Sequence, residues 1–392
     1  MSHVIDPPPL ELDWELYRPR HDTLRAEVRA WVDASIRPHV DEWEAQDEPG
    51  FPRGLFADAA RAGLFGWKVD EAFGGNGVDF LADCVVVEEL ARGGSGGVAA
   101  ALGAHKDLGS YYIWRFGTDE QRARWVPPSM HGEIVTALGV TEPHAGTDVA
   151  RIRTRAVRQP GGDWLLNGTK TFITNGSWAD VLVIAAQTTE EGGHHGMTLF
   201  VVDKDDPGFT SRRIDTLGWR TSHTGELSFA DVRLPADRLL GGEELLHQGF
   251  VCIMRNFQWE RISMALAGTV AARRVLDEGV RLLVDRHGRI PEGWRWRLAD
   301  LDAEVRAVRA LTVHALRLYL HGQDAVREVS MAKAKASVLS VTVADAVLEA
   351  HGASGVTATP WIQRALRDSR LNPIGGGTTE IMLEVVGRTL GL

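Results

Sequence analysis

The order of three blocks with different hydrophobic periodicity restricts the fold of this chain more than any other feature. In the first block, apolar residues recur at spacings of three and four, as in helices with one buried face: Leu24, Val28, Trp31, Val32 and Ile36. After Glu133 come short β-rich runs, and long periodic helical segments return from about Leu245. The sequence therefore predicts an N-terminal helical domain (1–132), a middle β domain (133–240) and a C-terminal helical bundle (241–392).

The middle block carries its own local signals. Asn167-Gly168 separates two apolar, β-rich runs, and we expect a hairpin turn there because both residues tolerate positive φ. The short runs follow one another without helices between them. This favours an antiparallel sandwich or barrel over a parallel sheet.

Composition and simple motifs exclude several classes of protein. The formal net charge of −10 argues against a general nucleic-acid or anionic-membrane binder. Cys84 and Cys252 are too few for a disulfide scaffold and indicate free thiols. The first residues lack a secretory pattern, and no apolar run is long enough for a membrane span, so we expect a cytoplasmic protein. His194-His195 has no partner at ligand spacing, so we expect no metal site.

A dinucleotide fingerprint is also excluded. Gly75-Asn76-Gly77 begins such a motif, but Phe80 stands where its third glycine belongs.

Four other segments combine glycines, hydroxyl groups and charges in patterns that plain loops do not need: LGVTEPHAGTD (138–148), NGTKTFITNG (167–176), QWERI (258–262) and IGGGTTEI (374–381).

Together these four segments resemble the motifs of the acyl-CoA dehydrogenase family, and the resemblance covers most of the chain. Further similarities are Arg367-Asp368, Met331-Ala332-Lys333 and the run from His351 to Gly355. The resemblance implies a mainly α, α+β fold: an N-terminal helical domain, a middle β-barrel domain and a C-terminal four-helix bundle. It also implies FAD, a homotetramer or dimer, a role in fatty acid metabolism, and electron-transfer flavoprotein as the acceptor.

The chemistry that the resemblance implies needs a carboxylate base. Oxidation of an acyl thioester removes a proton from C2, and the C3 hydrogen leaves as hydride to flavin N5. Most family members are known for a glutamate at the position that is Gly376 here. The long-chain and isovaleryl types instead place the base in a helical Glu-Arg pair, which here is Glu260-Arg261. We therefore assign the base to Glu260; the plain alternative is a solvated glutamate near a helix start.

The resemblance also assigns the other site residues. The Gly376 N–H helps to hold the thioester oxygen, a second catalytic contribution. Thr141 faces the flavin, Thr147 faces the substrate, and Phe172 and Thr174 lie against the isoalloxazine ring. The full expected cofactor set is Leu138, Val140, Thr141, Gly146, Thr147, Phe172, Ile173, Thr174, Arg286, His351, Gly352, Gly355, Thr378 and Glu380. The expected substrate set is Thr147, Arg261, Gly376 and Gly377. Arg261 points about 100° away from Glu260 on a helix, so we expect it to be structural or to pair elsewhere and not to neutralise the base.

One segment departs from the family pattern. Arg286 matches an arginine that reaches the FAD of a neighbouring subunit, but the Phe-Gly and glutamine that normally follow it are missing. Three alternatives remain beside the acyl-CoA dehydrogenase: a dehydrogenase of carrier-protein thioesters, a flavin-dependent monooxygenase on the same fold, and a binding protein that has lost the cofactor. Chain length and branching of the acyl group do not follow from the sequence.

Overall fold

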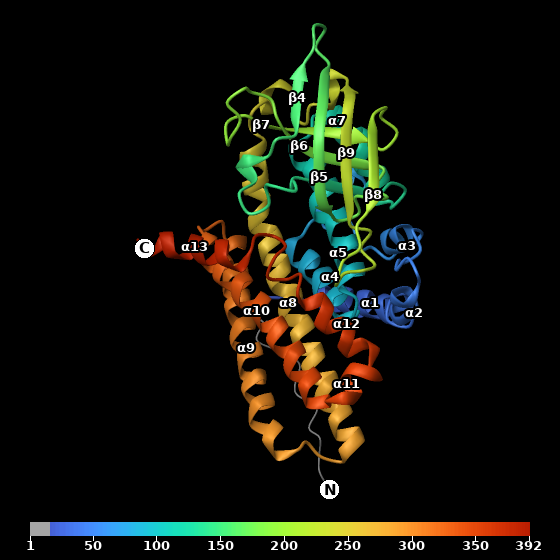
Figure 1. Cartoon of the computed structure of the whole chain (residues 1–392), viewed down its shortest axis with the longest axis vertical. Helices are drawn as coiled ribbons and strands as arrows, with labels where there is room; N and C mark the ends of the chain where they lie inside the picture. The colour runs from blue at the N-terminus through green and yellow to red at the C-terminus, as the bar shows by residue number, and fades with distance from the viewer. Residues whose placement is uncertain (1–15) are drawn as a thin grey trace.

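The computed structural model describes residues 16–392 and shows a helical N-terminal part, a sheet and a long helical bundle (Figure 1). The first part contains seven α-helices and a short two-stranded sheet; the helices are α1 (Pro19–Ser35), α2 (Val40–Ala45), α3 (Leu55–Arg61), α4 (Phe80–Arg92), α5 (Gly96–Ala104), α6 (Ser110–Phe116) and α7 (Asp119–Met130), and the strands are β1 (Lys68–Val69) and β2 (Gly77–Val78). A π-helical turn, η3 (His105–Gly109), joins α5 to α6.

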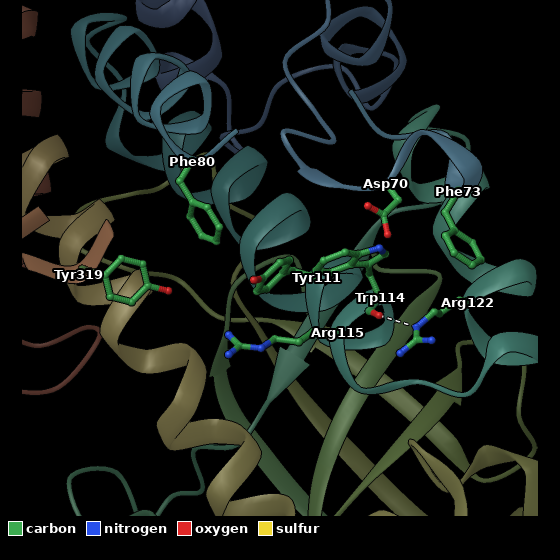
Figure 2. Close-up of a pocket in the computed structure, with 8 residues that line it drawn as sticks. All are labelled: Asp70, Phe73, Phe80, Tyr111, Trp114, Arg115, Arg122 and Tyr319. Atoms are coloured by element: carbon green, nitrogen blue, oxygen red, sulfur yellow. Dashed lines mark hydrogen bonds between the residues drawn. The ribbon is translucent and has the colours of Figure 1, made fainter. Parts of the chain in front are cut away.

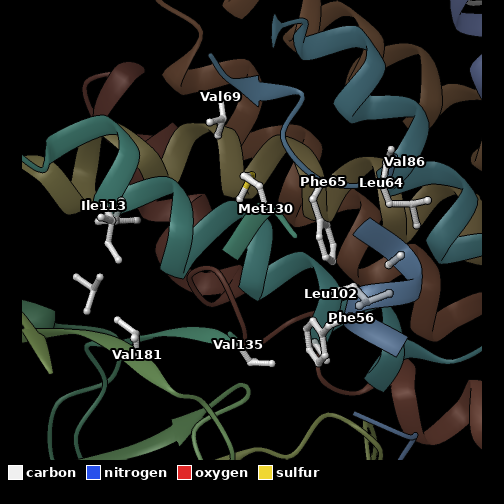
Figure 3. Close-up of a cluster of buried hydrophobic side chains, with 14 of the residues drawn as sticks. Phe56, Leu64, Phe65, Val69, Val86, Leu102, Ile113, Met130, Val135 and Val181 are labelled. Atoms are coloured by element: carbon white, nitrogen blue, oxygen red, sulfur yellow. The ribbon is translucent and has the colours of Figure 1, made fainter. Parts of the chain in front are cut away.

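Local chemistry explains where these helices begin. The Asp79 carboxylate caps α4 by accepting the N–H groups of Leu81 and Ala82. Thr118 and Gln121 form a capping box at the start of α7. The helices then bury one face each, so that Phe56 of α3, Val86 of α4 and Leu102 of α5 meet side chains of the sheet in one core (Figure 3).

The middle part is one curled, seven-stranded sheet. Its strands are β3 (Thr136–Gly139), β4 (Arg155–Arg158), β5 (Trp164–Ile173), β6 (Val181–Gln187), β7 (Met197–Asp203), β8 (Phe209–Arg213) and β9 (Gly225–Leu234). Their order is β3-β6-β4-β5-β9-β8, and β7 pairs with β6. Most pairs are antiparallel, in agreement with the predicted antiparallel sheet, but β6 runs parallel to β3 and to β4, which local sequence patterns did not indicate. The helices of the N-terminal part cover one face, which lets a parallel pair be buried.

The predicted hairpin at Asn167-Gly168 was wrong. Both residues lie inside the continuous strand β5, at a shift in its register with β9. Gly168 has φ of 143°, and a Cβ there would stand 2.5 Å from the Thr154 hydroxyl, so the glycine serves a bulge and a close strand contact. The Asn167 side chain exchanges two hydrogen bonds with Asp231 on β9, at 3.0 and 2.9 Å.

The C-terminal part is the predicted bundle. Its helices are α8 (Gly249–His287), α9 (Glu292–Leu320), α10 (Val326–His351), α11 (Ala353–Thr357), α12 (Pro360–Ser369) and α13 (Thr379–Thr389), the last of which projects sideways at the C-terminus (Figure 1). Helix α8 is shared, because its first turns pack against the sheet and α6 while the remainder packs against α9 and α10. Helix α8 thus connects the sheet to the bundle. The predicted site residues lie in both of these parts.

Candidate active site

The first two motif segments meet at one edge of the sheet. The Thr171 N–H donates to the Thr141 carbonyl at 2.9 Å, and Lys170 Nζ donates to the Val140 carbonyl at 3.0 Å. A buried ion pair fixes this junction, since Lys170 Nζ lies 2.8 Å from Glu142 Oε1. The second Glu142 oxygen accepts the Arg153 N–H at 2.6 Å. These bonds hold the pKa of Glu142 below its usual value against the effect of burial, so its carboxylate is a structural anchor.

This edge presents an unusual apolar surface. Phe172 is 64% exposed and has φ of 57°, a conformation that turns its ring outward from the strand. Thr174, two residues further along the chain, and Thr141, whose carbonyl accepts the Thr171 N–H, are half-buried, and Thr147 is exposed. The side chains of Val140 and Ile173 are buried in the cores, so only their backbone groups can contact a ligand.

The third and fourth segments meet in the bundle. A Cβ placed on Gly376 would stand 3.5 Å from Glu260 Oε1 and 2.4 Å from Met264 Sδ. The φ of Gly376 is 63°, a conformation that favours glycine. The structure therefore brings Glu260 directly against the residue that replaces the usual glutamate, and the space for a side chain at position 376 is already filled.

Replacing Gly376 by alanine should disturb this arrangement. We expect Gly376→Ala to lower the rate of flavin reduction by acyl-CoA at least about tenfold, because the new methyl group must displace Met264 or the loop and reactions are sensitive to shifts of about 1 Å. Gly375→Ala is the matched control, since its Cβ meets nothing closer than 3.6 Å. Stopped-flow reduction of both variants tests this; an unchanged rate in Gly376→Ala contradicts the geometry.

The environment of Glu260 favours its neutral form. Its Oε2 atom is buried and has no hydrogen-bond partner among residues 16–392. Burial raises the pKa of Glu260 to about 7, and the positive charges of Arg261 and Lys333 only partly oppose this effect. Helix α8 begins at Gly249, so Glu260 lies well inside a long helix and is not a solvated residue at a helix start. A carboxyl group that ionises near neutral pH suits a general base.

Arg261 contacts the glycine loop. Its Nε donates to the Gly376 carbonyl at 3.4 Å, and a Cβ on Gly377 would stand 3.7 Å from its guanidinium. This contact supports the prediction that Arg261 pairs away from Glu260. At the end of the loop, the Thr378 hydroxyl caps α13 by accepting the Ile381 N–H at 3.3 Å, while Glu380 is exposed.

Sequence reasoning missed three residues that adjoin Glu260. Asn256 and Met264 lie one helical turn before and after it, at the spacing that places side chains on one face, which could have identified them. Tyr112 of α6 is fully buried, and the charge of Glu260 adds to burial in raising the pKa of its phenol. No sequence pattern indicates Tyr112, because only the packing of α6 against α8 brings it there.

A second group of predicted residues lies far from Glu260. Arg286 is 26 residues further along α8, about 39 Å at 1.5 Å per residue. It donates to the hydroxyls of Ser354 and Thr359, and His351 Nε2 lies 3.1 Å from the Gly279 carbonyl. Gly352 and Gly355 belong to the same end of the bundle. The structure therefore does not bring this group to the Glu260 site within one chain.

A cavity of about 410 Å³ lies between the N-terminal helices and α9 (Figure 2). Its lining residues are Asp70, Phe73, Phe80, Tyr111, Trp114, Arg115, Arg122 and Tyr319. None of the predicted site residues is among them. The rings of Phe80 and Tyr319 pack against Trp259, the residue before Glu260, with centroids 4.9 and 5.9 Å away. The cavity thus borders a different face of α8 from the one that carries Glu260.

The arrangement of segments has counterparts among known proteins. Models of the N-terminal, middle and C-terminal domains of acyl-CoA dehydrogenases match residues 18–133, 137–232 and 247–391. The chain belongs to the acyl-CoA dehydrogenase family. This acyl-CoA dehydrogenase is 34% identical over 383 residues to the mitochondrial long-chain specific acyl-CoA dehydrogenase of Sus scrofa, covering 96% of this chain and 87% of that protein.

Solved structures agree with this assignment. The acyl-CoA dehydrogenase from Geobacillus kaustophilus superposes with a TM-score of 0.90 at 34% identity, covering 96% of this chain and 99% of the other. A glutaryl-CoA dehydrogenase from Mycobacterium smegmatis in complex with FADH2 gives a TM-score of 0.88 at 28% identity, with 97% of each chain covered. The predicted family, fold class, acyl-CoA dehydrogenation and FAD cofactor are confirmed. Among residues 16–392, no helix is long and apolar enough to cross a membrane.

The residues present fit FAD. The outward ring of Phe172 offers an apolar surface to a flat ring system, and the buried hydroxyl of Thr379 has no hydrogen-bond partner within residues 16–392. The Asp368 carboxylate of α12 connects the bundle to the other two parts of the chain. It accepts the N–H group of Gly96, in α5, at 2.8 Å and that of Trp219 at 2.7 Å. The loop that carries Trp219 belongs to the middle sheet, so Asp368 fixes the bundle relative to the edge that carries Phe172.

Proposed function

We propose that Glu260 is the base of this acyl-CoA dehydrogenase. The observation that carries the proposal is the position of its carboxyl group, 3.5 Å from where a Cβ on Gly376 would stand, at a residue whose backbone has positive φ. Glu260 Oε2 is buried, and no group in the described part of the chain hydrogen-bonds to it, which leaves it able to accept a proton. This assignment places the chain with the long-chain and isovaleryl types, whose base lies in the helical Glu-Arg pair.

In this mechanism the chain's own residues hold the substrate and move one proton. The Gly376 N–H has no hydrogen-bond partner among the described residues and would donate to the thioester oxygen as negative charge develops there. Glu260 would take the proton from C2. FAD, when bound, supplies the acceptor for the hydride from C3. Arg261, Gly377 and the exposed Thr147 would complete the contacts to the thioester.

We also propose the expected FAD contacts. Phe172 and Thr174 would lie along the flavin ring, with Thr141, Thr378 and Glu380 around it. The remaining expected contacts are Leu138, Val140, Gly146 and Ile173. Arg286, His351, Gly352 and Gly355 lie too far along the bundle to serve the same FAD, so they would reach the cofactor of a second subunit. A homo-oligomer, tetrameric or dimeric, follows from this proposal. From the family we further propose electron-transfer flavoprotein as the electron acceptor and a cytoplasmic role in fatty acid metabolism.

The rate of flavin reduction should rise with pH. A carboxylate accepts a proton only when it is ionised, and burial raises the pKa of Glu260 to about 7. We therefore expect the rate to rise about tenfold per pH unit below pH 7 and to level off above it. Stopped-flow reduction from pH 5.5 to 9 measures this. A rate already constant at pH 5.5 would show that the base ionises near the ordinary value for glutamate.

Anaerobic titration with thioesters tests the function and its substrate range together. Purified holoenzyme is mixed with straight, branched and dicarboxylic acyl-CoA thioesters and with the same acyl groups on a carrier protein. Bleaching of the flavin band by one class of acyl-CoA supports the proposal and identifies the acyl group. The names of the relatives leave this group open, since they include long-chain and glutaryl types. Bleaching by carrier-protein thioesters alone would show that the enzyme is a dehydrogenase of carrier-protein-bound acyl groups in a biosynthetic pathway.

A further inference from the structure

The loop 372–378 that faces Glu260 is held from behind by buried side chains. Lys333 of α10 is fully buried, and its Nζ donates to the carbonyls of Asn372, at 3.1 Å, and Gly377. Ser337, one turn further along α10, donates to the same Asn372 carbonyl at 3.0 Å. Arg261 holds the intervening Gly376 carbonyl from α8. Two cations on different helices therefore fix consecutive peptide groups of this loop.

Fixing the carbonyl groups also fixes the N–H groups. In a trans peptide the C=O and N–H point in opposite directions, so a carbonyl turned toward Lys333 or Arg261 turns the next N–H away from that cation. Among the described residues, the N–H groups of Gly376, Gly377 and Thr378 have no hydrogen-bond partner. Gly376 and Gly377 have φ of 63° and 98°. Successive free N–H groups on such a backbone form a concave site for an anion or a developing oxyanion.

We propose that Lys333 is a positioning residue that holds the 372–378 loop by its carbonyl groups, so that its free N–H groups are presented to the thioester oxygen. The proposal rests on the proposed function and adds two donors to the Gly376 N–H. They are the Gly377 N–H, opposite the Gly376 carbonyl that Arg261 holds, and the Thr378 N–H, opposite the Gly377 carbonyl that Lys333 holds. A buried ammonium group is costly unless it is satisfied, and here the loop carbonyls satisfy it. The negative charges of Glu260 and Glu380 also stabilise the ammonium form of Lys333 at longer range. Both raise the pKa of Lys333, which burial lowers to about 8.

Removal of the ammonium group should loosen the loop and slow the chemistry without emptying the flavin site. In FAD-loaded Lys333→Met, we expect the rate of flavin reduction to fall about 100-fold while the apparent acyl-CoA dissociation constant changes less than about threefold. Lys335→Met is the matched control, because Lys335 lies two residues away on α10 and is exposed. It should behave as the wild type.

Hydrogen exchange supplies a measurement that does not depend on activity. Two backbone bonds close the loop, from Gly375 N–H to Leu371 O at 3.0 Å and from Thr379 N–H to Pro373 O at 2.9 Å. In Lys333→Met holoenzyme these two amides should exchange at least about tenfold faster than in the wild type or in Lys335→Met. Unchanged exchange, or an unchanged reduction rate per bound flavin, would overturn the proposal.

A second variant keeps the test decisive if Lys333→Met does not fold. Ser337→Ala removes one hydrogen bond to the Asn372 carbonyl and leaves the charge in place. Faster exchange at Gly375 and Thr379, with reduction several-fold slower, supports the positioning role; wild-type values for both overturn it. If no thioester reduces the wild-type flavin, the proposed function fails by itself, while the exchange measurement still decides whether Lys333 holds the loop.

Discussion

Replacing Glu260 by glutamine should leave a folded, yellow protein whose flavin is reduced by acyl-CoA about 1,000-fold more slowly. Glutamine keeps the shape of the side chain but cannot take the C2 proton, and a positioned base contributes about 10²–10⁴ to a rate. Among residues 16–392, Glu260 Oε2 has no hydrogen-bond partner, so the change breaks no hydrogen bond at this atom. Stopped-flow reduction under anaerobic conditions, with the substrate that bleaches the wild type, measures the effect.

The stability of this variant should not fall at pH 8. Burial raises the pKa of Glu260 to about 7, above its unfolded value, so the carboxyl favours folding in its protonated state and that contribution is lost as the pH rises through 7. A neutral glutamine carries no such loss. Glu384→Gln is the matched control, because Glu384 is an exposed glutamate of α13 outside the proposed site, and its flavin should be reduced at nearly the wild-type rate. A wild-type rate in Glu260→Gln would show that another group is the base.

The second large effect concerns stability. Lys170→Met removes the buried ammonium partner of Glu142 and leaves its carboxylate with two backbone donors and the His144 ring, whose Nε2 lies 3.4 Å from Glu142 Oε2. Loss of one member of a buried pair typically costs about 3–5 kcal/mol. We expect a decrease of that size in the free energy of unfolding, measured by urea denaturation of the apoprotein. The junction between the first two motif segments, and with it FAD affinity, should weaken as well.

Lys204→Met is the matched control for Lys170→Met. Lys204 pairs with Asp180 at 2.9 Å in the same sheet, but its side chain is 50% exposed. An exposed pair contributes about 0–1 kcal/mol, so this variant should unfold at nearly the wild-type urea concentration. Equal effects of the two substitutions would mean that the Glu142 carboxylate finds another partner once Lys170 is gone.

Several properties followed from the sequence alone because they depend on local pattern or on whole motifs. Apolar spacing placed the helices before and after a β-rich middle, and the motifs identified the family, its cofactor and Glu260 as the candidate base. Local pattern failed at Asn167-Gly168, where a dipeptide suited to a turn serves a bulge inside β5. Local pattern also gave no indication of the parallel pairing of β6, because strand partners distant in sequence are set by burial and not by neighbouring residues.

What the sequence determined by itself is the set of elements and the inventory of reactive groups, since both are carried by residues close together in the chain. Only the tertiary structure decided which groups meet. It placed Glu260 against Gly376, 116 positions away in the chain, and added Met264, Tyr112 and Lys333 to that site. It also separated Arg286 from the site along the same helix. The physical reason is that burial and the packing of helix against helix set the pKa of Glu260 and the direction of the loop's N–H groups, and neither depends on sequence neighbours alone.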